Sequence, residues 1–382
     1  MPRIAIIGNY PPRRCGIATF TRDVAHGLTG LGCELNLIAM RGDTPRQDYL
    51  GEVTTVVDET CRDAHRRAGE AINRWRPDVV LVEHEFGIFG GPSGLWLLDM
   101  LDAIDAPVVT TLHTVLAEPN EEQRLVVSRL AARASRLIVM ARAGAAILEA
   151  QGVPADRIAV VPHGAPDRPW RRPTNGRASI GWPDRPTLLT FGLMSPGKGI
   201  EHVIDALPRI LLDVPDAHYV LLGATHPHLV AREGEAYRES LTARAEQLGV
   251  AHALTMIPRF VSCDELCDAL AASDLYVTPY DNPQQITSGT LAYALALGKP
   301  VLSTPYVHAR EVLPAEWIVP HGNAAALGER AAAMLSDPAA LEALSRETWH
   351  RFRPTVWSAV ARQTLDVLHG AMPAPTALEA AE

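Results

Sequence analysis

The sequence of 382 residues lacks any run of 18 uninterrupted apolar residues, and no charged segment with a long apolar stretch precedes its first strand-like run. We therefore expect no membrane-spanning helix and no signal peptide, and we expect a cytoplasmic protein. Basic residues are in deficit, with 35 Lys and Arg against 44 Asp and Glu, a formal net charge of −9. Because nucleic-acid phosphates demand a basic face, this balance argues against nucleic-acid binding.

Cysteine is scarce and follows no pattern. The chain has five cysteines, an odd number, and no C-x-x-C pair. This predicts free thiols in a reducing compartment and gives no support for a disulfide framework. No H-E-x-x-H or similar spacing occurs either, so we expect no bound metal and no resident cofactor.

What the sequence does contain is a repeated alternation of short apolar runs and amphipathic stretches. The runs are β-branched, apolar on both faces and bounded by Gly, Pro or Asp, which is typical of covered parallel strands. The last predicted strand is Trp317–Val319. The alternation predicts an α/β protein with two doubly wound Rossmann-like domains facing across a cleft, and ligands near the carboxyl ends of the strands.

Composition sets the expected boundaries. Residues 1–165 form the first Rossmann-like domain, and the proline-rich, polar stretch 166–186 is a linker. Residues 187–345 form the second Rossmann-like domain. Residues 346–370 form a C-terminal helical segment, and 371–382 form a flexible tail.

Lysine is almost absent: 33 of the 35 basic residues are arginine, and the exceptions are Lys198 and Lys299. Lys198 lies in the loop F-G-L-M-S-P-G-K-G (191–199), between a predicted strand and a helix. An ammonium group is a compact point charge suited to phosphate, so we predict that Lys198 and neighbouring amides bind an anion. Lys299 precedes Pro300 at a strand start, and we expect it to be an ordinary solvated lysine.

Two further glycine-containing segments open predicted helices. Ser288-Gly289-Thr290 places hydroxyls and free amides at a helix N-terminus, an arrangement that suits an anion or a sugar hydroxyl. The loop Gly8–Ile17 lacks the G-x-G-x-x-G pattern, and its Gly16 amide either approaches a phosphate or only completes a turn.

Three histidines, His84, His113 and His163, fall at strand ends of the first sheet. Each alone favours a structural role, but together they indicate a ligand site. Arg129, Arg133 and Arg136 lie at helical spacing and would suit peripheral contact with an anionic membrane, although we expect a solvated helix face.

In this order the segments resemble the retaining family-four glycosyltransferases (group 1) of the GT-B fold, over residues 4–369. The most specific are residues 191–199 and A-L-A-L-G-K-P-V (294–301). Cys15–Phe20 resembles the family's N-terminal glycine loop, and Thr111-Leu112-His113 resembles its cleft histidine. Pro162-His163-Gly164 resembles the hinge between its domains, and residues 346–370 resemble the helix that crosses back to the first domain.

The resemblance implies transfer of a hexose from a nucleotide sugar, GDP-mannose or UDP-glucose, to a carbohydrate or other small hydroxyl acceptor. It implies that Lys198 binds the distal phosphate of the donor and that His113 contacts the sugar. We predict His113, Lys198 and Arg259 as catalytic residues. The predicted donor-binding residues are Gly16, Lys198, Arg259, Gln284, Gln285, Ser288, Gly289, Thr290 and Tyr293. The predicted acceptor-binding residues, in the first domain, are Tyr10, Arg14, Glu85 and His163.

Two departures from the family pattern keep alternatives open. Leu193 stands where the family commonly has an arginine, and Gln285 and Tyr293 stand at the two positions of its E-x7-E motif. We predict that Arg259 replaces the missing cation. One alternative is a phosphorylase or sugar-1-phosphate-using enzyme on the same fold. The other is a non-catalytic sugar- or nucleotide-binding protein.

Overall fold

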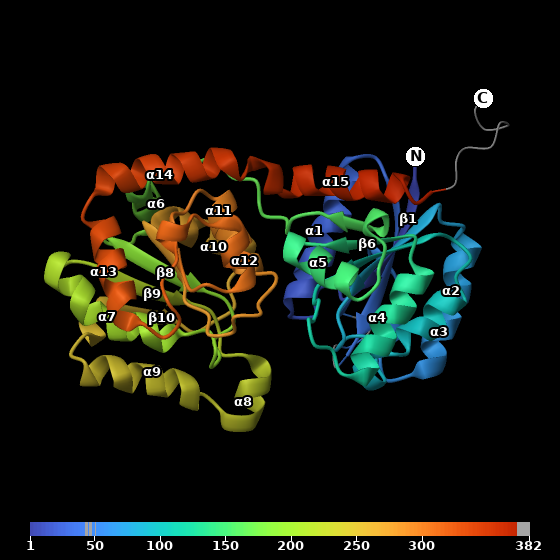
Figure 1. The fold of residues 1–382 in the computed structure, drawn as a ribbon, viewed down its shortest axis with the longest axis horizontal. Coiled ribbons are helices and arrows are strands. Elements are labelled where there is room, and N and C mark those ends of the chain that lie inside the picture. Colours follow the sequence, from blue (N-terminus) through green and yellow to red (C-terminus); the bar gives the residue numbers. More distant parts are fainter. Residues whose placement is uncertain (43–44, 46–47, 50, 373–382) are drawn as a thin grey trace. The chain divides into compact units, whose positions relative to one another are not determined.

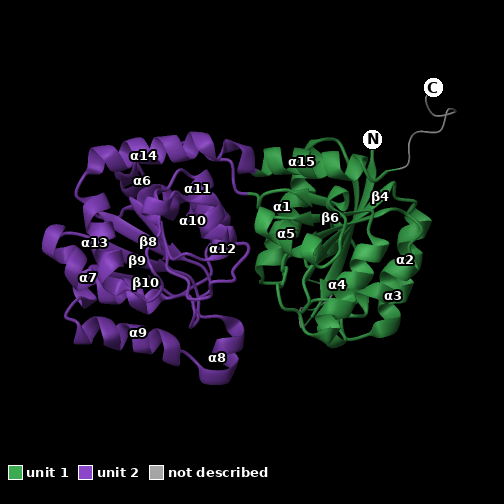
Figure 2. Ribbon diagram, viewed as in Figure 1, with its two compact units in different colours: residues 1–164, 357–382 green, residues 165–356 purple. Residues whose placement is uncertain are grey.

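The computed structural model describes residues 1–42, 45, 48–49 and 51–372, and it divides into two compact units (Figures 1 and 2). Unit 1 comprises residues 1–164 and the C-terminal segment from Trp357, and unit 2 comprises residues 165–356. Each unit is a parallel sheet covered by helices, so the predicted pair of doubly wound α/β domains is confirmed. Most of the predicted tail, residues 373–382, lies outside the described residues.

The sheet of unit 1 has seven strands in the order β3-β2-β1-β4-β5-β6-β7, and the pairs are parallel. The strands are β1 (Arg3–Gly8), β2 (Glu34–Arg41), β3 (Val53–Asp58), β4 (Val79–His84), β5 (Val108–Leu112), β6 (Arg136–Val139) and β7 (Ile158–Val160). The chain first moves outward from β1 to β3 and then returns to place β4 on the other side of β1. In sheets with such a reversal, ligands bind at the carboxyl ends of the two strands that flank it, here β1 and β4.

The α-helices of unit 1 come from both ends of its chain. They are α1 (Gly16–Gly30), α2 (Arg62–Trp75), α3 (Leu97–Asp102), α4 (Glu121–Arg133), α5 (Arg142–Ala150) and α15 (Trp357–His369). Helix α15 packs on α1, and buried Val360 and Leu368 of α15 join the same apolar core as Val24 and Leu28 of α1. The approach is close because Gly27 has no side chain: a Cβ there would lie 2.5 Å from the Cβ of Ala361.

The sheet of unit 2 has five strands in the order β10-β9-β8-β11-β12, again in parallel pairs. They are β8 (Thr187–Phe191), β9 (His218–Leu222), β10 (Leu254–Ile257), β11 (Leu275–Thr278) and β12 (Val301–Ser303). The α-helices are α6 (Pro173–Ile180), α7 (Ile200–Asp213), α8 (Pro227–Glu233), α9 (Ala236–Gln247), α10 (Cys263–Ala272), α11 (Gly289–Ala296), α12 (Val307–Val312), α13 (Ala324–Leu335) and α14 (Pro338–Arg351). The strand order reverses between β8 and β11, so the carboxyl ends of these two strands are the expected ligand-binding edge of this unit.

Two segments differ from the sequence-based expectation. The stretch 166–186, expected to be a linker, contains helix α6, whose Gly176 lies so close to α10 that a Cβ there would be 2.6 Å from the Ala271 carbonyl carbon. Trp317–Val319, expected to be a strand, begins in a 3-10 turn and pairs with the sheet only through Ile318 and Ser303. Proline on both sides of this segment, Pro314 and Pro320, limits the pairing because proline has no N–H to donate.

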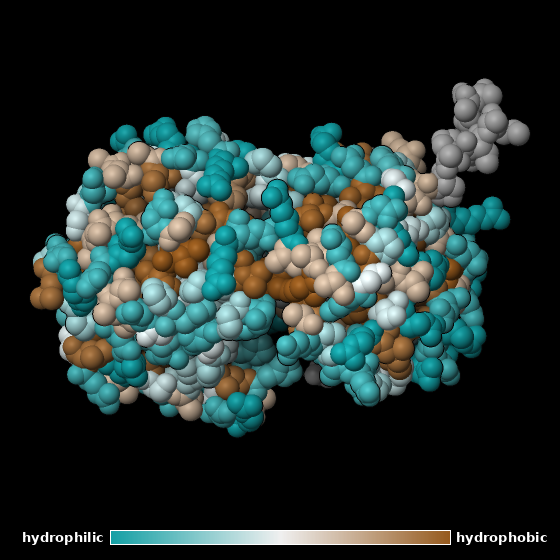
Figure 3. Space-filling model, viewed as in Figure 1, coloured by the Kyte–Doolittle hydropathy of each residue, from teal (hydrophilic) through white to brown (hydrophobic). Residues whose placement is uncertain are grey.

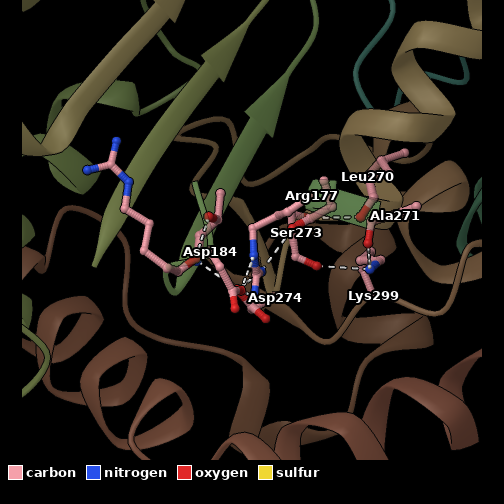
Figure 4. Close-up of polar contacts among 10 residues, drawn as sticks. Arg177, Asp184, Leu270, Ala271, Ser273, Asp274 and Lys299 are labelled. Carbon is pink, nitrogen blue, oxygen red and sulfur yellow. Dashed lines mark hydrogen bonds and ion pairs between the residues drawn. The ribbon is translucent and has the colours of Figure 1, made fainter. Parts of the chain in front are cut away.

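The expectation of a solvated Lys299 is wrong. The side chain is buried, and its ammonium donates to the carbonyls of Ala271 at 3.3 Å and Ser273 at 2.9 Å, which end helix α10 (Figure 4). Nearby, buried Arg177 of α6 pairs with Asp274 at 2.8 Å. Burial lowers the pKa of Lys299 from 10.5 to about 8, and Asp274 partly opposes this. Lysine at this position satisfies helix-end carbonyls inside the core of unit 2.

This burial predicts a pH dependence of stability. The pKa of Lys299 is lower in the folded than in the unfolded chain, so the unfolded chain binds more protons between about pH 8 and 10.5. The contribution of Lys299 to the free energy of unfolding should therefore increase as the pH rises through that window. Urea unfolding of the wild type and Lys299→Met at pH 7.5 and pH 10 tests this. The gap between the two proteins should shift in favour of the wild type at pH 10, and identical pH profiles would contradict it.

The α1–α15 contact predicts opposite outcomes for two glycines of one helix. Gly27→Ala inserts a methyl group against Ala361 and should destabilise unit 1 by about 1–3 kcal/mol. Gly30→Ala, whose Cβ would meet nothing within 4 Å, should be neutral or stabilise by up to about 1 kcal/mol, because alanine favours helix. Thermal unfolding measures both, and equal effects would show that α15 does not depend on this contact.

Candidate active site

In unit 2, the loops that follow β8 and β11 touch through their backbones. The Asp281 N–H donates to the Gly197 carbonyl at 3.0 Å. Gly199 has a left-handed φ of +64°, and a Cβ there would lie 1.9 Å from the Pro279 carbonyl oxygen. On the same side, a Cβ on Gly192 would lie 3.4 Å from a methyl carbon of Thr290. Because Gly199 has no side chain, the lysine loop can lie directly beside the segment that leads to α11, with Gly192 at ordinary contact distance from Thr290.

Lys198 is half-buried, and its ammonium lies 4.1 Å from the centre of the Tyr280 ring. Among the described residues, no carboxylate forms an ion pair with it. The Tyr280 hydroxyl and the Thr290 hydroxyl are hydrogen-bonded at 2.9 Å. A cation on an aromatic face gains roughly 0.5–2 kcal/mol, less than a phosphate partner would provide, so this charge is available to an anion.

A buried histidine, His308, holds the backbone at the start of α11 through hydrogen bonds. The Ser288 side chain caps the helix by accepting the Leu291 N–H at 3.3 Å. The Ser288 N–H donates to Nδ1 of His308 at 2.9 Å, and the His308 N–H donates to the Gln285 carbonyl at 3.1 Å. Burial lowers the pKa of His308 to about 4, so its ring stays neutral and keeps the Nδ1 lone pair at neutral pH. His308, which sequence reasoning missed, therefore holds the predicted donor-binding segment in place.

The remaining residues predicted for the donor fall into two groups. Gln285 and Gln284 lie on the loop that leads to α11. The amide of Gln285 donates to the Thr287 carbonyl at 2.6 Å, and Gln284 is exposed. Arg259 and Tyr293 are placed differently. Arg259 follows β10, two strands away from β8, and its guanidinium pairs with Glu265 at 2.7 Å. Tyr293 is 9% exposed and packs in an apolar core cluster.

In unit 1, the corresponding strand ends hold a buried carboxylate. Glu83, at the end of β4, is 1% exposed and lies against Gly8, where a Cβ would be 3.0 Å from the Cβ of Glu83. Nε2 of His113 donates to Glu83 at 2.8 Å, and the Thr111 hydroxyl donates to it at 3.4 Å. This carboxylate fixes the orientation and the tautomer of the imidazole. Sequence reasoning did not select Glu83, although an acid ending the apolar run V-V-L-V-E-H is a visible signal.

His113 and His163 gather around one aromatic ring, whereas His84 does not. The Phe20 ring from α1 meets His113, His163 and Trp357 edge-on, with ring centres 4.6, 5.1 and 5.0 Å away. His84 lies in the core beside Phe86 and Phe89, and neither ring nitrogen has a partner among the described residues. Burial lowers the pKa of His84 to about 3. Only two of the three strand-end histidines therefore belong to the candidate site.

The loop between β1 and α1 is stiffened by side-chain bonds. The Asn9 amide accepts from Arg13 at 3.1 Å and donates to the sulfur of Cys15 at 3.2 Å, and that sulfur caps α1 by accepting the Ala18 N–H. Gly16 has open space around it. Arg14 and Gly16 are exposed, while Tyr10 is 1% exposed and belongs to the core. Of the predicted residues on this loop, Arg14 and Gly16 are accessible to a ligand and Tyr10 is not.

Glu85, predicted to bind the acceptor, already accepts two hydrogen bonds just beyond the end of β4. One carboxylate oxygen accepts the Phe86 N–H at 2.8 Å and the other accepts the Thr114 hydroxyl at 2.6 Å. A carboxylate keeps further lone pairs after two hydrogen bonds, so Glu85 can still accept from a ligand hydroxyl.

Arg129, Arg133 and Arg136 do not form the membrane-facing row that their spacing allows, because Arg136 begins strand β6 and does not lie on helix α4. Arg133 donates to the carbonyls of Leu101, Ile104 and Ala106, and Arg129 pairs with Asp102. On the face drawn in Figure 3, hydrophilic and apolar residues are interspersed. Within the described ranges, no helix is long and apolar enough to cross a membrane. The same residues include no group of three or more His, Cys, Asp or Glu that could hold a metal.

Both halves of the chain match glycosyltransferase families. Residues 15–167 match Glycosyltransferase Family 4, and residues 185–337 match Glycosyl transferases group 1. Among curated proteins, a GDP-mannose-dependent α-(1-6)-phosphatidylinositol monomannoside mannosyltransferase from Mycolicibacterium smegmatis is 30% identical over 34% of this chain. An uncharacterised glycosyltransferase from Methanocaldococcus jannaschii is 27% identical over 53% of it. The matches span 28% and 50% of the lengths of those two relatives.

Solved structures show the same fold at low identity. HepE of Anabaena, in complex with UDP and glucose, has a TM-score of 0.78 at 14% identity and covers 97% of this chain and 100% of its own. Sucrose-phosphate synthase of Thermosynechococcus elongatus has a TM-score of 0.74 at 17% identity and covers 100% of both chains. The predicted GT-B fold is therefore confirmed.

The contact between the two unit 2 loops predicts different outcomes for the two glycines that flank Lys198. Gly197 and Gly199 both have positive φ, so alanine at either position costs about 1–2 kcal/mol. A Cβ at 197 meets nothing within 4 Å, whereas one at 199 clashes with the Pro279 carbonyl. Gly199→Ala should displace the loop and lower affinity for phosphate ligands at least tenfold, while Gly197→Ala keeps it within about threefold. Calorimetric titration with UDP and GDP measures this, and equal losses would contradict it.

Proposed function

We propose that this chain, which is built from two glycosyltransferase domains, transfers a hexose from a nucleotide sugar to a hydroxyl of a carbohydrate or other small acceptor, with retention of anomeric configuration. The observation that carries the proposal is the position of Lys198 on the Tyr280 ring, whose hydroxyl is hydrogen-bonded to Thr290 at the start of α11. An ammonium without a carboxylate partner among the described residues, together with the first amides of a nearby helix, suits the distal phosphate of an activated sugar.

The chemistry needs the departing phosphate to be stabilised. As the acceptor oxygen attacks the anomeric carbon, the bond from that carbon to the phosphate oxygen breaks and negative charge grows on the phosphate. Lys198 and the amides of Gly289 and Thr290 would face that charge, and the phosphate oxygen would take the proton of the acceptor hydroxyl. Groups already fixed in place stabilise such charge without reorganising during the step.

Unit 1 would supply the contacts to the sugar and the acceptor. His113, held by Glu83 and edged by Phe20, would bind a hydroxyl of the transferred sugar. Glu85 and His163 would line the acceptor side, and Arg14 on the exposed loop would reach an acceptor oxygen. These roles rest on the placement of the residues at one edge of the sheet.

The relatives give two donors to test first. The mannosyltransferase relative is named as GDP-mannose-dependent, and HepE was solved with UDP and glucose. GDP-mannose and UDP-glucose are therefore our proposed donors, with a carbohydrate or small hydroxyl compound as acceptor.

A second candidate function is favoured by Leu193 and Tyr293. Position 193 lacks a cation, and Tyr293 packs in the core, where it offers no carboxylate to a nucleotide ribose. A phosphorylase or sugar-1-phosphate-using enzyme would need neither group. Phosphate-dependent glycosidic cleavage would support this candidate, and indifference to inorganic phosphate would exclude it.

Removing the Lys198 ammonium tests the main proposal. Lys198→Ala should lower kcat/KM for nucleotide-sugar turnover by roughly 10- to 150-fold, because a lost charge-assisted contact to a phosphate oxygen costs roughly 1.5–3 kcal/mol and this one strengthens as the bond breaks. Release of UDP or GDP from the common sugar nucleotides, with a panel of simple glycosides as acceptors, is the measurement.

The matched control is Arg209→Ala, which removes one positive charge from an exposed i,i+4 pair with Asp213 on α7. It should leave turnover unchanged. Wild-type protein that neither binds nor turns over any common sugar nucleotide would refute the proposal, and so would a Lys198→Ala variant as active as the wild type.

A further inference from the structure

The loop that follows β9, residues 223–228 with sequence G-A-T-H-P-H, lies beside the lysine loop. The Met194 N–H donates to the Ala224 carbonyl and the His226 N–H donates to the Met194 carbonyl, both at 2.9 Å. A Cβ on Gly223 would lie 2.0 Å from the Gly192 carbonyl oxygen, so only glycine permits this approach. The backbone of His226 is therefore fixed to the loop that carries Lys198.

The hydrogen bonds of His226 define which ring nitrogen carries its proton. The His228 N–H donates to Nδ1 of His226 at 3.3 Å, so Nδ1 acts as an acceptor. The neutral ring must then carry its proton on Nε2. No side chain or carbonyl of the described residues accepts that proton, and the half-buried ring stacks on His228 with a centre separation of 5.4 Å.

The surroundings of His226 favour its neutral form. Burial lowers the pKa of His226 first, and the charges of His228 and Lys198 lower it further. The carboxylate next to this loop, Glu235, is engaged by the Thr225 hydroxyl and by Arg238. His226 thus presents an uncompensated N–H in the positive field of Lys198, where an anion would be attracted.

The residue at position 193 explains why the phosphate would need a second hydrogen-bond donor besides Lys198. The phosphates of an activated sugar carry more negative charge than one ammonium neutralises, and Leu193 contributes none. Arg259, predicted to replace the missing cation, pairs with Glu265 and follows β10, which lies two strands away from β8. A metal role for the two histidines is disfavoured because Nδ1 of His226 is already occupied and no third ligand accompanies them in the described part of the chain.

We propose that His226 is a further donor-site residue, whose Nε2–H donates to a phosphate oxygen of the same group that Lys198 binds. This inference rests on the proposed function, because it assigns a second contact to the phosphate of the activated sugar. His228 acts as a positioning residue: its backbone N–H holds the His226 ring in the required tautomer.

The experiment compares substitutions of both histidines in the full chain. His226→Ala removes the donor, whereas His226→Gln keeps an N–H at a similar reach. His228→Ala keeps the backbone N–H that orients His226. The control is His252→Ala, an exposed histidine of the same unit. The readouts are calorimetric titration with UDP, GDP and glucose 1-phosphate, and KM and kcat for any donor that the wild type turns over.

We expect His226→Ala to weaken binding of the phosphate ligand by roughly 10- to 100-fold and to raise KM similarly, with an unchanged melting temperature. His226→Gln should recover most of the loss, and His228→Ala and His252→Ala should stay within about threefold of the wild type. If the wild type and Lys198→Ala differ but His226→Ala binds like the wild type, this inference is overturned while the proposed function stands. If the wild type binds none of the probes, the proposed function itself fails.

If His226→Ala both weakens ligand binding and lowers the melting temperature, the weaker binding could come from the lost N–H donor or from lost stability. His226→Gln separates these two causes. Recovery of stability and binding together in His226→Gln supports the donor role. Recovery of stability without binding contradicts it, because the side-chain N–H is then not sufficient.

Discussion

The contact between the Gly199 backbone and the Pro279 carbonyl is the constraint on which the unit 2 site depends. It exists because the strand order reverses between β8 and β11, so that loops 80 residues apart leave the sheet side by side. Any side chain at 199 would separate them. Lys198 directly precedes Gly199 and lies on the ring of Tyr280, which directly follows Pro279, while His308 holds the Ser288 backbone at the start of α11.

The sheet of unit 1 has the same kind of strand-order reversal, but different functional groups lie at the strand ends. The reversal lies between β1 and β4, but the group placed there is a buried carboxylate, Glu83, rather than a cation. The carboxylate orients His113, and Phe20 fixes the face of the ring. One unit thus presents positive charge and amide donors suited to phosphate, and the other presents a histidine and acidic groups suited to hydroxyls. The proposed transfer from a phosphate-activated sugar to a hydroxyl would use both kinds of group.

Much of this arrangement follows from local sequence. The alternation of apolar runs predicts both sheets, and the rarity of lysine singles out Lys198. Local patterns do not show which elements that are distant in the sequence lie side by side in the fold. Lys299 reads as solvated because its partners, the carbonyls of Ala271 and Ser273, lie on another element. In the sequence, Arg259 is a plausible phosphate ligand. The strand order, which places its strand β10 two positions from β8, cannot be read from the sequence. His226 and His308 gain their roles only through backbone contacts to distant loops.

The central claim is that Lys198 binds the distal phosphate of an activated donor, and phosphorus NMR tests it most directly. Titration of the wild type into UDP or GDP should shift the β-phosphorus resonance much more than the α-phosphorus resonance. The same titration with Lys198→Met should abolish that difference. A β-phosphorus shift that survives in Lys198→Met, or wild-type spectra that stay unchanged with both nucleotides, would contradict the account.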